Sequence, residues 1–190
     1  GLMRVRAIPE TLAERIAVLT GIAPTPIVDT LHAVIVARAI VVATKLGVFD
    51  ALVEGPAKPA GLAGRLGLDA RALEKLLNLL VATDYLKHGR SGYALSPLSR
   101  KWLVAGSPHS LRDSMLLRLL EWQAIDTTED FVRTGKSLDV HEVIQGNQWD
   151  IYQRGMHALA RLSAGEVARR LKLPADATAM LDIGGGHGAH

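Results

Sequence analysis

Hydrophobic positions recur at helical spacing along most of the chain. Leu12, Ile16 and Leu19 fall on one face of a segment that stops at Gly21, which predicts a short amphipathic helix over residues 11–19. A second helix is expected from Asp29, which is a candidate N-cap. Its apolar residues run almost all the way round, and they are Leu31, Val34, Ile35, Val36, Ile40, Val41 and Val42.

A helix without a clear polar face is buried on several sides. In a chain of this size, we expect part of the cover to come from a second copy of the protein. The alternative is a central core helix that is covered within one chain. The most apolar run, residues 33–43, contains Arg38 and is too short for a membrane span, which needs about 20 apolar residues.

The next section predicts a helix-turn-helix followed by a hairpin. Two helices are expected over residues 60–66 and 70–81, joined by a tight turn. Asp69, at the end of this turn, is the expected N-cap of the second helix. Segments 85–88 and 92–95 read as two short strands. Together these elements predict a winged helix-turn-helix.

Helices are then expected to begin at Ser96-Pro97 and Ser107-Pro108, because serine caps a helix and proline suits its first position. A last long helix is predicted over about residues 149–171. One stripe of this helix carries Trp149, Tyr152, Met156, Leu159, Ser163 and Val167.

The last residues predict a buried strand over 179–183 that enters a glycine-rich turn. Gly184, Gly186 and Gly188 bring bare backbone amides up to a ligand, as at the start of a nucleotide-binding domain. Asp182 stands two places before the first glycine, where nicotinamide-binding strands carry an apolar residue. A carboxylate suits a cationic ligand, and S-adenosylmethionine has both an ammonium and a sulfonium.

These elements predict a mainly α fold with three parts. Residues 1–105 form a helical dimerisation and winged-helix domain, and residues 106–178 form a helical connection. Residues 179–190 are the first strand and Gly-rich loop of a truncated Rossmann-like α/β domain.

Composition narrows the function classes. The net charge of +3 is spread over 22 basic and 19 acidic residues, which is weak support for nucleic-acid binding. Cysteine is absent, so thiol nucleophiles and thiolate metal sites are excluded. The histidines show no metal-ligand spacing, and we expect His32, His88, His109, His141 and His157 to be surface or singly satisfied residues. With no signal-peptide pattern at the start, a cytoplasmic protein is the default expectation.

The glycine motif, residues 181–188, resembles the first cofactor motif of class I S-adenosylmethionine-dependent methyltransferases. Upstream segments occur in the order found in caffeate-type O-methyltransferases and their bacterial polyketide-tailoring relatives. These segments are residues 43–50, 66–69, 95–98, 132–135 and 152–156.

The resemblance implies a homodimer held through its N-terminal helices. It also implies methyl transfer from S-adenosylmethionine to a hydroxyl of an aromatic small molecule. Asp182 and the three glycines would bind the cofactor, while Trp149, Tyr152 and Met156 would line the substrate pocket. The family's general base and ribose-binding acid lie further along, so we expect no catalytic residue within this chain and no activity from it alone.

Four alternatives stay open. Tyr152 and Met156 can be simply the apolar stripe of an amphipathic helix. The winged helix can bind DNA, with Arg71, Lys75 and Asn78 in the major groove and Lys87, His88 and Arg90 near phosphates. The chain can also be an inactive dimerisation scaffold, and relatives of this family methylate nitrogen or carbon as well as oxygen.

Overall fold

The structure, a computed structural model, describes residues 9, 11–139, 141, 144–172, 176, 178–179 and 181. This part of the chain is helical, with one two-stranded antiparallel sheet. The elements in chain order are α1 (Leu12–Leu19), α2 (Thr25–Ile27), the π-helical turn η1 (Val28–His32), α3 (Ala33–Lys45), α4 (Val48–Ala51), α5 (Pro59–Leu66), α6 (Ala70–Ala82), β1 (Leu86–Gly89), β2 (Gly92–Leu95), α7 (Pro97–Trp102), α8 (Arg112–Asp126), α9 (Thr128–Thr134) and α11 (Gln148–Arg170).

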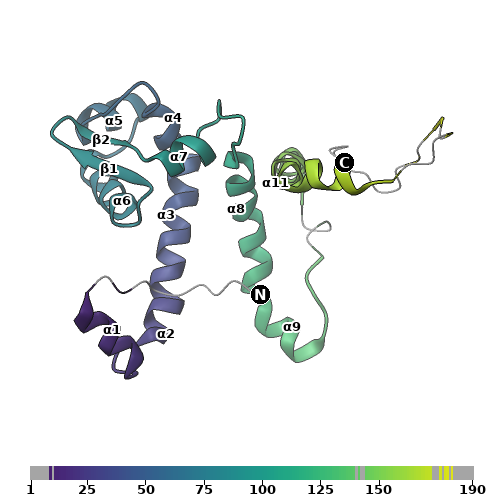
Figure 1. Cartoon of the computed structure of the whole chain (residues 1–190), viewed down its shortest axis with the longest axis horizontal. Helices are drawn as coiled ribbons and strands as arrows, with labels where there is room; N and C mark the ends of the chain where they lie inside the picture. Colours follow the sequence, from purple (N-terminus) through teal and green to yellow (C-terminus); the bar gives the residue numbers. More distant parts are fainter. Residues whose placement is uncertain are drawn as a thin grey trace.

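Helix α8 lies between the N-terminal core and the last long helix. Figure 1 shows α3 and α8 side by side and running in opposite directions, and the two helices are in contact. The α5–α6 pair and the hairpin gather around the C-terminal end of α3, while α11 packs on α8 on the side away from α3. Contacts made by α11 therefore reach the N-terminal core through α8.

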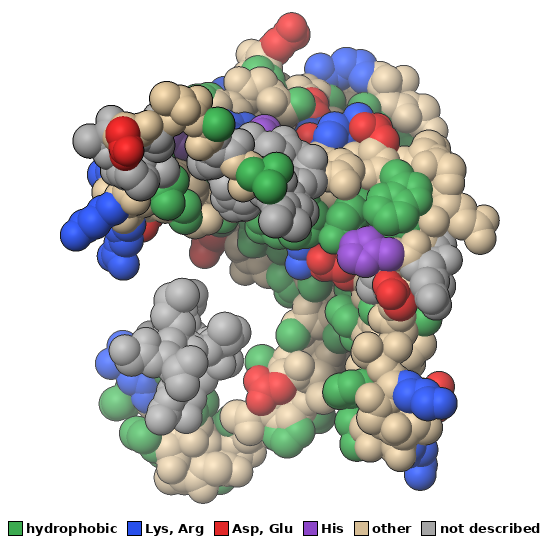
Figure 2. All heavy atoms as spheres, turned by 90° about the vertical axis from the view of Figure 1, so that its right-hand side faces the viewer, with side chains coloured by type: hydrophobic (Ala, Val, Ile, Leu, Met, Phe, Trp, Pro, Cys, Tyr) green, Lys and Arg blue, Asp and Glu red, His purple; other side chains and the backbone are tan. Residues whose placement is uncertain are grey.

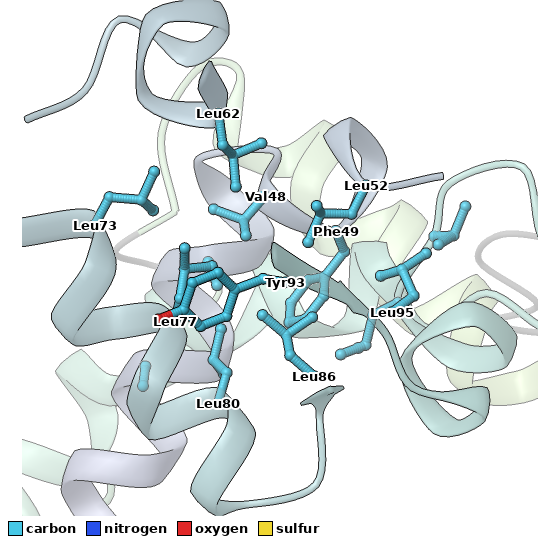
Figure 3. Close-up of a cluster of buried hydrophobic side chains, with 14 of the residues drawn as sticks. Val48, Phe49, Leu52, Leu62, Leu73, Leu77, Leu80, Leu86, Tyr93 and Leu95 are labelled. Carbon is cyan, nitrogen blue, oxygen red and sulfur yellow. The ribbon is translucent and has the colours of Figure 1, made fainter. Parts of the chain in front are cut away.

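The main core lies between α3, α4, α5, α6 and the hairpin. Its side chains converge from all of these elements, as Figure 3 shows for Phe49, Leu77 and Leu86. Tyr93 enters the same core and donates a hydrogen bond from its hydroxyl to Oδ1 of Asn78 at 2.6 Å. Burial raises the pKa of the Tyr93 phenol, and the nearby charge of Glu74 raises it further.

The hairpin has a third backbone partner. Strands β1 and β2 pair from Leu86 opposite Leu95 to Gly89 opposite Gly92. The amide and carbonyl of Ala57 exchange two hydrogen bonds of 2.9 Å with Tyr93 on the outer side of β2. Gly92, at φ +110°, allows this close approach, because a Cβ there would collide with the Ala57 carbonyl group.

The predicted order of two helices and a hairpin is confirmed, and so are two of the predicted caps. Asp69 accepts a hydrogen bond from the Ala72 amide at the start of α6, and Ser96 accepts one from the Ser99 amide at the start of α7. Whether this arrangement acts as a winged helix stays a prediction.

Two predicted helix starts are wrong. Asp29 lies inside a helical run that already begins at Thr25, because Pro26 is tolerated in a first turn that lacks amide partners. Helix α8 begins at Arg112 rather than at Ser107-Pro108. The Ser107 hydroxyl instead donates to the Lys101 carbonyl and accepts from the His109 amide, which closes a turn.

The apolar helix is longer than predicted and less covered. Elements α2, η1 and α3 form one helical run, Thr25–Lys45, of 21 residues, with a mean hydropathy of 1.8 in its most apolar stretch and 22% of that stretch buried. By length and composition this run could cross a membrane, a test that core helices of soluble proteins also pass. Ala39, Val41, Ala43 and Thr44 are buried, whereas Val34 is 61% exposed. Its N-terminal half therefore has little cover from the described part of its own chain.

Helix α8 is fixed to the core by the carboxylate of Asp50. One oxygen accepts a hydrogen bond from the Ala105 amide at 2.8 Å, and the other accepts one from Nε of Arg112 at 3.3 Å. The two oxygens thus bind the loop after α7 and the first residue of α8.

Candidate functional site

The candidate substrate residues lie on one stripe of α11. Trp149 and Tyr152 are in edge-to-face contact, with ring centroids 5.9 Å apart and planes at 81°. Tyr152 and Met156 are half-buried against the small cluster formed by Leu117, Leu120 and Ile144. Such packing is expected if Tyr152 and Met156 are simply the apolar stripe of an amphipathic helix. Trp149 is 40% exposed and remains accessible.

His141 contacts two residues of this stripe, although it is not on α11. Helical spacing did not predict these contacts. Its Nε2 lies 3.0 Å from the Tyr152 hydroxyl oxygen, and its ring stacks on Trp149 with planes 9° apart and centroids separated by 5.7 Å. The Tyr152 ring stands at 79° to the imidazole. The three rings therefore form a corner, with two parallel rings and a third one perpendicular to both.

Asp139 supports the imidazole from the other side. Its Oδ1 accepts a hydrogen bond from the His141 amide at 2.9 Å and lies 3.5 Å from Nδ1 of the ring. An aspartate two residues before a histidine is a usable sequence signal for such a pair. The contact with Tyr152, which is 11 residues further on, is not visible from spacing.

The face of the molecule to which α11 belongs carries this chemistry. Figure 2 shows hydrophobic side chains gathered beside a histidine and an acidic side chain on that face. The predicted cofactor residues Asp182, Gly184, Gly186 and Gly188 lie outside the described residues, so their arrangement is not part of this geometry. Among the residues that the structure describes, no group of acidic, histidine or cysteine side chains could hold a metal ion.

A polar cavity of about 410 Å³ lies between α8 and α11. Its charged side chains are largely paired, since Arg112 contacts Asp50 and Asp113, and Arg154 contacts Asp150 at 2.6 Å. Arg161, also on the wall, donates to the Pro108 carbonyl. Because these cations have partners, the cavity does not specify an anionic ligand.

An apolar cavity of about 430 Å³ lies between α3, α7 and α8. Trp102, Met115 and Trp122 are on its walls, and the guanidinium of Arg38 lies 3.9 Å above the Trp122 ring. From α3 the cavity is lined by Ala37, Ile40 and Val41, so it lies beside the C-terminal half of the apolar helix.

The face proposed for DNA is only weakly basic. Arg71, Lys75 and Asn78 are exposed on α6 as predicted, but Glu74 is exposed among them. The Asn78 side chain already accepts the Tyr93 hydrogen bond. This face of α6 therefore offers few cations that could contact DNA phosphates. A DNA-binding protein typically makes about 6–10 such contacts.

Residues 28–105 match the family model described as the O-methyltransferase dimerisation domain. The chain contains an O-methyltransferase dimerisation domain. It is 33% identical over 176 residues to the mitomycin biosynthesis 6-O-methyltransferase of Streptomyces lavendulae, an alignment that covers 85% of this chain and 49% of that enzyme. It is 30% identical over 186 residues to the acetylserotonin O-methyltransferase of Mus musculus, covering 86% of this chain and 47% of the enzyme.

The fold is also found in a solved structure of this family. Human N-acetylserotonin methyltransferase in complex with SAM superposes with a TM-score of 0.70 at 22% identity, covering 86% of this chain and 50% of that one. The chain spans about half the length of these relatives. The DNA-binding alternative receives no support from these comparisons.

Proposed function

We propose that this chain is the dimerisation and acceptor-binding part of an S-adenosylmethionine-dependent O-methyltransferase that acts on a hydroxyl of an aromatic small molecule. The similarity to the mitomycin enzyme carries the proposal. It extends over 85% of the chain, well beyond the dimerisation domain at residues 28–105. The similarity therefore includes residues outside the dimerisation domain.

The cofactor proposal rests on the chemistry of the last residues. Gly184, Gly186 and Gly188 leave backbone amides accessible, and Asp182 adds a carboxylate for a cationic group. When bound, S-adenosylmethionine would supply an activated methyl group on its sulfonium. The solved relative that superposes on this chain is itself a complex with SAM.

The acceptor proposal rests on the aromatic corner of α11. Trp149 offers an exposed indole, and Tyr152 offers a phenol that it contacts edge-on. Met156 adds a soft side chain that packs on the same small cluster as Tyr152. Aromatic side chains at right angles suit a flat ring that stacks on one of them and meets the edge of the other. Two of the relatives are named as O-methyltransferases, one of mitomycin biosynthesis and one of acetylserotonin.

The dimer proposal rests on apolar surface that has no cover. Leu31, Val34 and Ile35 are exposed along the helical run Thr25–Lys45. Helix α1 has no buried residue although its N-terminal capping box is formed, and eight residues are too few for a helix to be stable in isolation. A second copy that packs on these helices would supply the missing burial in a homodimer.

The site would be completed outside this chain. We infer that a general base and a ribose-binding acid come from a following part of the methyltransferase domain, so that the 190-residue chain alone transfers no methyl group. A cytoplasmic location, expected from the sequence, is part of this proposal.

Calorimetric titration with S-adenosylmethionine tests the cofactor site. The protein that continues through the whole methyltransferase domain should bind it, and Asp182→Ala should weaken binding by about tenfold or more, as expected for a charge-assisted contact. Asp176→Ala, a change of the same kind six residues earlier, is the matched control and should bind normally. Equal affinity of the wild type and Asp182→Ala would refute this assignment.

A further inference from the structure

The two ring nitrogens of His141 each face a polar neighbour, Asp139 at Nδ1 and Tyr152 at Nε2. The Asp139 carboxylate near Nδ1 favours a proton on that nitrogen, which leaves Nε2 as a hydrogen-bond acceptor. The Tyr152 hydroxyl, 3.0 Å from Nε2, is then the donor. Asp139, His141 and Tyr152 thus form a directed chain of polar contacts that ends at a phenol oxygen.

This chain fixes how the phenol presents itself to a ligand. With its hydrogen directed at His141, the Tyr152 oxygen keeps its lone pairs for an incoming donor. The imidazole also stacks on Trp149, and the planes of these two rings lie 9° apart. His141 therefore controls both the polar edge and the flat wall of the corner.

We propose that His141 is the positioning residue of the acceptor site, where it orients Tyr152 and Trp149 so that the site selects aromatic ligands that carry a hydrogen-bond donor. This inference rests on the proposed function, since the aromatic acceptor is part of that proposal. His141 acts through its two neighbours, and its side chain is 57% exposed at the rim of the corner. A change at this rim position should leave the fold intact.

The test uses the protein with its complete methyltransferase domain, and acetylserotonin, a hydroxyindole, as the probe. Equilibrium binding of the probe is measured by quenching of tryptophan fluorescence, and KM and kcat are measured where transfer occurs. The variants are His141→Phe, which keeps an aromatic ring without the ring nitrogens, and Tyr152→Phe, which removes only the hydroxyl. His109→Phe is the matched control, because His109 is also exposed and its ring also lies near a tryptophan, Trp102.

We expect His141→Phe and Tyr152→Phe each to raise the Kd and the KM of the probe about three- to tenfold, the size expected for one lost hydrogen bond. The double variant should lose no more than either single variant, because both changes break the same contact. His109→Phe should bind like the wild type. Thermal unfolding temperatures should be equal in the wild type and in all four variants, which separates positioning from a structural role.

Unchanged Kd and KM in His141→Phe would overturn the inference, and so would losses in the two single variants that simply add. Binding of the probe that depends on His141 without any binding of S-adenosylmethionine would leave the inference standing and reject the proposed function. Failure of the wild type to bind any hydroxylated aromatic probe would reject both.

Discussion

Gly155 of α11 lies directly against Leu117 of α8. A Cβ at position 155 would come within 2.6 Å of the Leu117 Cβ and 3.1 Å of the Asp113 carbonyl oxygen. Leu117 is fully buried in the small cluster that also receives Tyr152 and Met156. The spacing between these two helices, and with it the position of the aromatic corner, depends on the missing side chain.

Gly155→Ala should therefore destabilise the α8–α11 packing. Alanine favours a helix by about 1 kcal/mol over glycine, but the overlap with Leu117 costs about 1–3 kcal/mol and should exceed that gain. Gly165→Ala is the control on the same helix, where an added Cβ meets nothing within 4 Å. Urea unfolding should show Gly165→Ala to be more stable than the wild type and Gly155→Ala less stable. Equal stabilisation by both changes would show that the contact does not limit the packing.

Gly92→Ala should weaken the hairpin. The residue has φ +110°, which side-chain-bearing residues rarely adopt, and its added Cβ would lie against the Ala57 carbonyl and 2.9 Å from the Lys58 amide nitrogen. We expect a loss of about 3 kcal/mol or more, because backbone atoms rather than flexible side chains are in the way. Gly89→Ala, which has open space at its Cβ, should change the free energy of unfolding by about 1 kcal/mol or less. The measurement is denaturant unfolding of both variants beside the wild type.

Tyr93 should make the protein less stable at alkaline pH. Its pKa is raised from the ordinary value of 10.0 by burial and by Glu74, so above about pH 10 the unfolded chain loses the phenol proton more readily than the folded one. The stabilisation is fully present below pH 10 and is lost as the pH rises toward the folded-state pKa. Tyr93→Phe should start less stable, because the Asn78 contact is lost, yet its stability should fall less steeply between pH 9 and 11. Parallel pH profiles for the two proteins would contradict this account.

Val34→Glu should block dimer formation. The side chain is 61% exposed in the single chain, in the middle of the uncovered apolar surface, and a charge buried in a dimer interface is strongly unfavourable. Analytical ultracentrifugation should give a dimer for the wild type and a monomer for the variant. Val132→Glu, on α9 outside the matched dimerisation domain and 76% exposed, should remain dimeric. A wild type that sediments as a monomer would reject the homodimer.

Much of the fold could be predicted from local patterns. Asp69 and Ser96 cap their helices as expected, because a capping side chain bonds amides only a few residues away. Asp29 and Ser107 do not cap their helices, because other local features took precedence. Proline allowed one helix to start earlier, and the Ser107 hydroxyl found partners in Lys101 and His109 instead.

The site was less predictable than the fold. Trp149, Tyr152 and Met156 share a stripe that helical spacing shows, and the contact between the two rings follows from an i, i+3 relation. His141 lies outside α11 and 11 residues before Tyr152 in the chain, so helical spacing could not predict its contacts. The partner of Gly155 is likewise invisible from sequence, because Leu117 lies on a different helix.

Methyl transfer to an aromatic hydroxyl is the activity that we propose, and it is tested by analysis of the methylated product. The protein with its complete methyltransferase domain is incubated with S-adenosylmethionine that carries a labelled methyl group and with matched hydroxy- and amino-aromatic compounds, acetylserotonin among them. We expect the label to appear on oxygen in the hydroxylated compounds and the 190-residue chain alone to give no product. Label on nitrogen only, or no transfer by a protein that is shown to be folded and dimeric, would contradict it.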